Sequence, residues 1–207
     1  MIDVLLGARL FIAASFVLAG FQDLKERAID DRIWIPGVIG ALLSLYWCYA
    51  NLSSPFFYIE LFKLGMFSGI GLAFALLGYV GQADAIALVL IGADPYLMSF
   101  TALIIAVFIA GVHVVAVYRK GFLKNGLLIP IEQFKLQNQW LPLAIVNAGQ
   151  TIDIAKNVNV SREDVIVKAP PNSEVMVQYG LPVVTYISLG YIAYLVISLI
   201  LAGGILV

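Results

Sequence analysis

The sequence predicts an all-α membrane bundle of six transmembrane helices, one of them short, with a small cytoplasmic β-containing insert before the last helix. Hydrophobic residues make up 62% of the 207 residues and charged residues only 12%, about half the charged fraction of soluble domains. The mean hydropathy is +0.98. These values exclude a soluble globular protein and a disordered one, and the formal net charge of −1 gives no hold on a nucleic acid.

Five apolar runs are long enough to cross a bilayer, which takes about 20 residues. They are 2–22, 33–50, 61–80, 96–118 and 182–206. Arg9 lies in the first run near its outer end, where we expect its side chain to snorkel to the surface. In the third run, Gly65 and Gly69 have the spacing that lets membrane helices approach closely.

The orientation follows from lysine and arginine, which collect in two regions. They are Lys25, Arg27 and Arg32 in the first region, and Arg119, Lys120, Lys124, Lys135, Lys156, Arg162 and Lys168 in the second. Basic loops face the cytoplasm. Both regions are inside only if the short apolar run 85–93 also crosses. We therefore expect a multi-pass protein of the cell membrane with both termini outside.

The character of the chain changes between the fifth crossing and the last. We divide it into a transmembrane bundle (1–118), a cytoplasmic insert (119–180) and the last helix (181–207). In the insert, 151–155 and 164–168 alternate as strands do. Trp140 belongs either to the core of the insert or to a membrane-facing anchor.

Acidic side chains in a membrane are costly, and they are functional candidates by default. Asp3, Glu60 and Asp94 fall at outer ends of the predicted helices, where we expect water to solvate them. Asp23 and Asp84 share a different location, the cytoplasmic boundary. They are far apart in sequence, on elements that must pack in one small bundle.

Two neighbouring carboxylates do not both ionise easily, so they share a proton and titrate as a unit. The ionised member can take a proton from water while the neutral one hydrogen-bonds a peptide carbonyl. This is aspartic-protease chemistry, and it needs no metal or cofactor. Gly81, Gln82 and Ala83 precede Asp84, and this junction would let backbone approach an extended substrate.

Other interpretations stay open. Asp84 is also placed to be the N-cap of the short helix, and Asp23 to be a solvated acid beside Lys25. A small transporter or ion-binding protein would use the same two aspartates, although such transporters usually have repeated halves and the halves here are unlike. A structural partner of a secretion or filament assembly would need neither aspartate.

Two motifs resemble those of a known family. The segment Phe21-Gln-Asp23-Leu-Lys-Glu-Arg27, followed by Ile33-Trp-Ile-Pro36, resembles the first motif of the archaeal preflagellin peptidases and type IV prepilin peptidases, which are GxGD-type intramembrane aspartic proteases. Gly81-Gln-Ala-Asp84 resembles their second motif, with Ala83 in place of a glycine. The resemblance covers 1–95 by motif and the whole chain by layout, and it implies that Asp23 and Asp84 are the catalytic pair.

The resemblance also implies a substrate. The family removes class III signal peptides, in which a short basic segment precedes the cleavage point and a hydrophobic segment follows it. The partners would be such precursors and membrane lipid. Bacterial relatives add an N-methyltransferase activity and a cysteine-rich loop, whereas this chain has one cysteine, Cys48. We therefore expect a peptidase without methylation. His113, the one histidine, is expected to hydrogen-bond a neighbouring helix.

Overall fold

The computed structural model describes residues 2–26, 29–77, 81–95, 99–119, 126–137, 140–147, 150–153, 165–167 and 169–204. The chain forms two compact units. The helical unit comprises Met1–Gly111 and Pro182–Val207, and the smaller unit comprises Val112–Leu181.

The longer helices of the described residues follow the apolar runs. They are α1 (Ile2–Glu26), α2 (Trp34–Asn51), α3 (Ser54–Leu76), α4 (Gln82–Ala93), α5 (Ser99–Arg119) and α8 (Val183–Gly204), with a short 3₁₀ turn, η1 (Asp31–Ile33), before α2. All but α4 are long and apolar enough to cross a membrane. Helix α4 has 12 residues, or about 18 Å, against a hydrocarbon core of about 30 Å. A mainly helical chain with five long apolar helices is thus confirmed, and it suggests a multi-pass membrane protein.

Helix α3 begins earlier than predicted. It starts at Ser54, seven residues before the apolar run 61–80. Pro55 lies in its first turn, where a proline without a backbone N–H costs no hydrogen bond. The earlier start places Glu60 within the helix, and its side chain is buried.

The glycines that bring helices together are not the pair predicted on α3. A methyl group on Gly65 or Gly69 would meet no atom within 4 Å, so that prediction is wrong. Gly71 has this role instead, because a methyl there would lie 3.2 Å from the carbonyl oxygen of Ala85. It allows α3 and α4 to pack closely near the start of α4.

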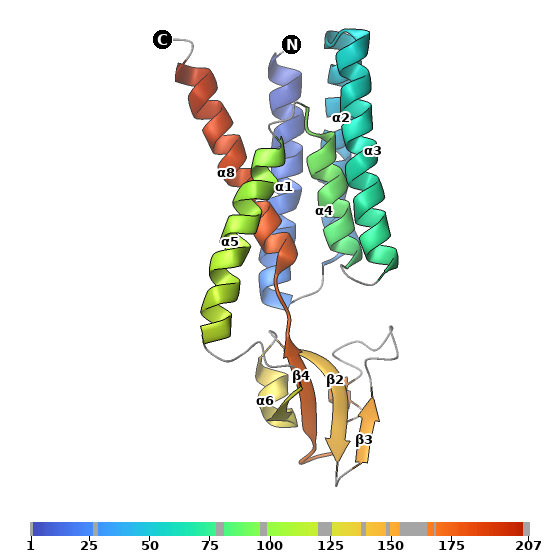
Figure 1. The fold of residues 1–207 in the computed structure, drawn as a ribbon, viewed down its shortest axis with the longest axis vertical. Coiled ribbons are helices and arrows are strands. Elements are labelled where there is room, and N and C mark those ends of the chain that lie inside the picture. The colour runs from blue at the N-terminus through green and yellow to red at the C-terminus, as the bar shows by residue number, and fades with distance from the viewer. Residues whose placement is uncertain are drawn as a thin grey trace. The chain divides into compact units, whose positions relative to one another are not determined.

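Helix α1 provides the centre of the helical unit's core. Figure 1 shows α8 on one side of α1 and α2 to α4 on the other. Phe16 of α1 is fully buried and packs against Trp34 and Tyr191, with ring centroids 6.2 and 4.9 Å apart. A methyl on Gly40 would lie 2.5 Å from the carbonyl oxygen of Ala8, so α1 and α2 are in close contact.

The smaller unit contains an antiparallel sheet in the order β1-β4-β2-β3. Its elements are β1 (Leu127–Pro130), α6 (Ile131–Leu136), β2 (Trp140–Asn147), β3 (Gln150–Asp153) and β4 (Glu174–Tyr179). Phe134 and Val175 are fully buried in its core. Trp140 is 3% exposed, and its indole N–H donates to Gln137 at 2.6 Å. Of the two interpretations of Trp140, the core position is correct.

One of the two predicted strands is wrong. Strand β3 covers 151–153 of the first, and the rest of that stretch lies outside the described residues. In the second, 165–167 is helical. Val165 is fully buried, and its carbonyl accepts a hydrogen bond from the N–H of Ala169 at 2.9 Å. A helical turn thus buries the same apolar side chain that an alternating strand would bury, and so short a pattern does not separate the two.

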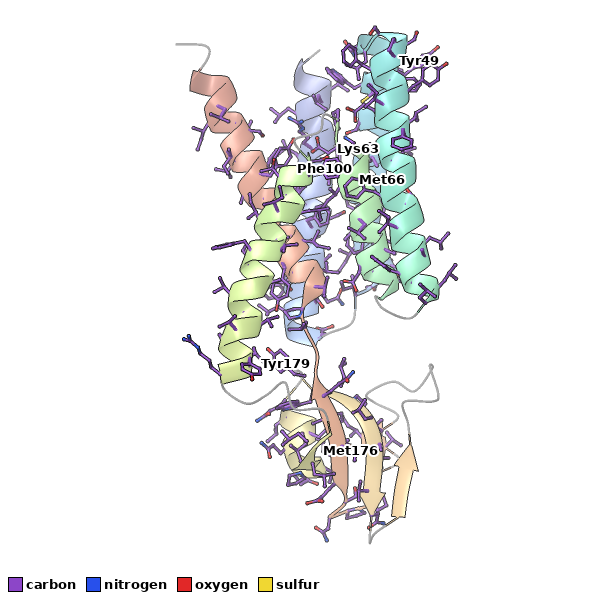
Figure 2. All side chains as sticks on the ribbon, viewed as in Figure 1. Tyr49, Lys63, Met66, Phe100, Met176 and Tyr179 are labelled. Atoms are coloured by element: carbon purple, nitrogen blue, oxygen red, sulfur yellow. The ribbon has the colours of Figure 1, made fainter. Side chains whose placement is uncertain are left out.

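His113 makes the kind of contact that the sequence predicts, with a different partner. Its Nε2 lies 3.2 Å from the hydroxyl of Tyr179, which Figure 2 labels. The partner is on strand β4 instead of a neighbouring helix. The Tyr179 ring in turn packs edge-on against Trp140, so His113 belongs to an aromatic cluster of the smaller unit.

Candidate active site

Asp23 lies in the last two turns of α1, and its side chain is turned towards α8. It is 8% exposed. Its Oδ2 accepts a hydrogen bond from the backbone N–H of Thr185 at 3.0 Å and lies 3.1 Å from the Thr185 hydroxyl. Thr185 is in the first turn of α8, where backbone N–H groups have no partner within the helix and the helix dipole attracts negative charge. The start of α8 is therefore a site that holds the Asp23 carboxylate.

Asp84 lies in the first turn of α4. The helix is capped by Gly81, and Oδ2 of Asp84 accepts the Gly81 N–H at 2.9 Å. Asp84 thus helps to cap its helix, from the third helical position instead of the N-cap position. Its second carboxylate oxygen accepts no hydrogen bond from the described residues. That oxygen remains available to a substrate or to a water molecule.

The fold brings the two aspartates into one region. The charge of Asp23 acts on the carboxyl group of Asp84, although they are far apart in the chain. Each lies at the N-terminus of a helix, Asp23 beside α8 and Asp84 within α4. Asp23 thus adds negative charge to the surroundings of Asp84.

The segment before Asp84 needs no unusual backbone conformation. Gly81 has φ −74° and ψ 164°, which any residue can adopt. Gln82 is exposed, and Ala83 is helical and packs against the core of the bundle. No glycine is required at position 83 for α4 to form, so the departure of Ala83 from the family motif leaves the position of Asp84 intact.

An apolar groove lies beside Asp23, between α1 and α8. Its volume is about 340 Å³, and its lining consists of Val17, Gly20, Phe21, Leu24, Thr185, Ser188, Leu189 and Ile192. The two hydroxyls in the lining are satisfied within the protein, since Thr185 donates to the Gly20 carbonyl and Ser188 to the Val184 carbonyl. Because Thr185 also contacts Asp23, the groove reaches the candidate site. Neither Thr185 nor the groove could be predicted from the sequence, because no motif contains them.

A buried ionic cluster is a second feature that the sequence did not predict. Asp94 is fully buried and Glu60 is 9% exposed, so the expectation that water solvates them is wrong. The Arg9 side chain is 15% exposed and, instead of turning to the surface alone, donates to Asp94 at 3.0 and 3.1 Å. Lys63 pairs with Glu60 at 2.6 Å, and Figure 2 shows it among the side chains between α3 and α4. Apolar helices surround these groups and exclude water, so the charges pair with one another.

The sequence did contain a signal for this cluster. Two basic and two acidic residues lie in or next to apolar helices, where unpaired charges are costly. Glu60 and Lys63 are three residues apart, one helical turn, which places them on the same face. The fourth acid placed at an outer end, Asp3, has a side chain outside the described residues.

Within the part of the chain that the structure describes, no group of three or more histidine, cysteine or acidic side chains is arranged to hold a metal ion. Comparisons with protein-family models, with curated proteins and with solved structures find no match. The resemblance to the prepilin and preflagellin peptidases therefore rests on the two motifs and on the layout of the chain.

Proposed function

We propose that this protein is a membrane aspartic endopeptidase. It removes the short basic leader, a class III signal peptide, from prepilin-like or preflagellin-like precursors at the cytoplasmic face of the cell membrane. The observation that carries this proposal is the placement of Asp23 and Asp84: Asp23 accepts the N–H of Thr185 at the start of α8, Asp84 caps the start of α4, and the charge of Asp23 acts on Asp84. Paired carboxylates at a membrane boundary suit peptide hydrolysis.

The surroundings of the two carboxylates suggest their roles. Asp23 accepts from the N–H of Thr185 and lies close to its hydroxyl, so we assign it the role of general base. Asp84 has one donor and a negative neighbour, so we assign it the role of general acid. Water adds its oxygen to the scissile carbonyl carbon and gives a proton to Asp23, while Asp84 protonates the carbonyl oxygen. When the C–N bond breaks, the amine leaves with the proton from Asp23, and one hydroxyl of the intermediate returns a proton to Asp84 as the carboxylic acid product forms.

The groove between α1 and α8 supports a substrate with a hydrophobic segment. Its lining is apolar and includes Thr185, which contacts Asp23. A precursor whose hydrophobic segment lies in the membrane beside α1 and α8 would present the preceding peptide bond to the aspartates. The leader is hydrophilic and basic, so it would remain in water on the cytoplasmic side.

The proposed orientation has six crossings, with α4 as the short one. Both termini are outside, and the 23–32 loop and the 119–180 insert are in the cytoplasm. Labelling of single cysteines in a Cys48→Ser background tests this. Cysteines in these two regions should be protected in intact cells and should react after permeabilisation. Labelling of the insert from outside would overturn the orientation.

The decisive experiment is cleavage of a precursor by membranes that contain the protein. The substrate is a prepilin-like or preflagellin-like protein with a class III leader, and the readout is a shortened product. Asp23→Asn and Asp84→Asn should give no product, while Glu26→Gln, a matched change of an exposed acid one turn along α1, should cleave normally. Failure of the wild-type protein to cleave, together with ion uptake into vesicles that both Asn variants abolish, would favour the ion-binding alternative.

A further inference from the structure

Asp94 connects α4 to two other helices through its side chain. It directly follows α4 and is fully buried. Its Oδ1 accepts two N–H groups of Arg9 on α1, at 3.0 and 3.1 Å, and its Oδ2 accepts the hydroxyl of Tyr191 on α8 at 2.7 Å. The hydroxyl of Tyr194, one turn further along α8, accepts from Arg9 at 3.0 Å and lies 3.4 Å from Asp94.

The backbone of Asp94 adds a third helix. Its carbonyl oxygen accepts a hydrogen bond from Lys63 of α3, which also pairs with Glu60. We call these six residues the Asp94 network: Arg9, Glu60, Lys63, Asp94, Tyr191 and Tyr194. The network has two positive and two negative side chains, so its formal charge is zero. It joins α1, α3, α4 and α8 at one residue.

The network and the candidate active site lie on the same two helices. Helix α1 carries Arg9 and, 14 residues later, Asp23, about 21 Å along the axis at 1.5 Å per residue. Helix α4 carries Asp84 and is followed by Asp94 ten residues later, about 15 Å away. Arg9 pairs with Asp94, and the charge of Asp23 acts on Asp84. The two helices are thus antiparallel, with the ion pair at one end and the two aspartates at the other.

Helix α4 is also held against α3 along its length. A methyl on Gly92 would lie 2.8 Å from the Phe67 side chain, and one on Gly71 would lie 3.2 Å from the Ala85 backbone. These contacts fix α4 relative to α3, whereas Asp23 is on α1. The Arg9–Asp94 pair is a direct, directional link between α4 and α1.

We infer that Arg9 and Asp94 are positioning residues: their ion pair sets the height and rotation of α4 against α1, and thereby the separation of Asp23 and Asp84. The consequence for cleavage rests on the proposed function, but the alignment of the helices does not. A misplacement of about 1 Å in a catalytic group can cost about a hundredfold in rate. Loss of the pair should therefore lower kcat and leave KM nearly unchanged.

The test measures the distance between spin labels at Leu24→Cys on α1 and Gln82→Cys on α4, both exposed, in a Cys48→Ser background. The main variant is Arg9→Leu/Asp94→Leu/Tyr191→Phe/Tyr194→Phe. It removes the ion pair together with the hydroxyls that depend on it, so no buried charge or polar group is left unpaired there, and such replacements often preserve stability. The control is Glu60→Gln/Lys63→Met, which removes the other buried ion pair and keeps Arg9–Asp94.

A positioning role predicts that the apolar variant folds, that its label distances broaden or shift, and that its kcat falls about a hundredfold, while the control keeps the narrow wild-type distribution. An unchanged distribution in the folded apolar variant would overturn the inference. If the apolar variant does not fold, Arg9→Lys is the deciding variant. It keeps the positive charge but loses the double hydrogen bond to Asp94, so the distribution of distances between the spin labels must broaden. The distances need no substrate, so they remain decisive even if the wild-type protein cleaves no precursor.

Discussion

The Asp94 network and the Asp23–Asp84 pair lie at opposite ends of α4, and their charges are balanced differently. In the network, Asp94 faces Arg9, and Glu60 faces Lys63, so each acid has a base. At the other end, backbone N–H groups hold the two carboxylates, and the charge of Asp23 acts on Asp84. A buried acid with a matched base indicates a structural role, whereas an acid with a negative neighbour is a candidate for proton transfer.

The largest effect is expected from changes at the Asp23–Asp84 end of α4. Asp23→Asn and Asp84→Asn keep the shape and remove the titrating group, so each should lower cleavage by a factor of about 10² to 10⁴ or more. The stability should change little, because an amide is cheaper to bury than a carboxylate. Product formation and thermal unfolding of the same preparations check both statements. Full activity in either variant would contradict the proposed mechanism.

The balanced end should respond in the opposite way. Asp94→Asn leaves Arg9 buried without a counter-charge, which should destabilise the protein by about 3–5 kcal/mol. Thermal unfolding in detergent measures the loss. Glu26→Gln, an exposed acid on α1, serves as the reference and should unfold as the wild type does. Wild-type stability in Asp94→Asn would mean that the network does not hold the helices together.

A change at Thr185 tests the assignment of Asp23 as the general base. Thr185→Val keeps the shape and the backbone N–H but removes the hydroxyl near Asp23. Because this hydroxyl donates to the Gly20 carbonyl, the change removes a neutral hydrogen bond beside Asp23, worth about 0.5–1.5 kcal/mol, so cleavage should fall by a factor of about 2 to 10. Ser198→Ala is the control, because that hydroxyl bonds to the Leu195 carbonyl within α8 and does not line the groove. Equal loss in both variants would contradict a specific role of Thr185.

A chelator is expected to have no effect on the rate of precursor cleavage. A divalent cation between Asp23 and Asp84 would balance their charges and remove the contrast with the Asp94 network. Because two carboxylates can activate water by themselves, EDTA should leave the rate of precursor cleavage unchanged. If EDTA inhibited cleavage and added Mg²⁺ or Zn²⁺ restored it, the mechanism would depend on a metal ion and not on the two carboxyl groups alone.

The sequence predicted the helices well and their contacts poorly. The apolar runs identified the five long helices and the short one, because the length of a run is local information. Gly65 and Gly69 have a contact spacing but face open space, while Gly71 makes the contact. The stretch 165–167 alternates like a strand and is helical. Spacing along one segment does not say which neighbour will cover it.

The amino-acid sequence alone predicts a protein rich in membrane-length helices, and it singles out Asp23 and Asp84 because so apolar a chain has few charged residues. What each acid faces depends on how the helices pack. The tertiary structure turned Asp94 from a solvated loop residue into the buried partner of Arg9, and it placed Thr185 beside Asp23. The physical reason is that the cost of a charge depends on the dielectric and the partners around it, and these come from helices that are distant in the chain.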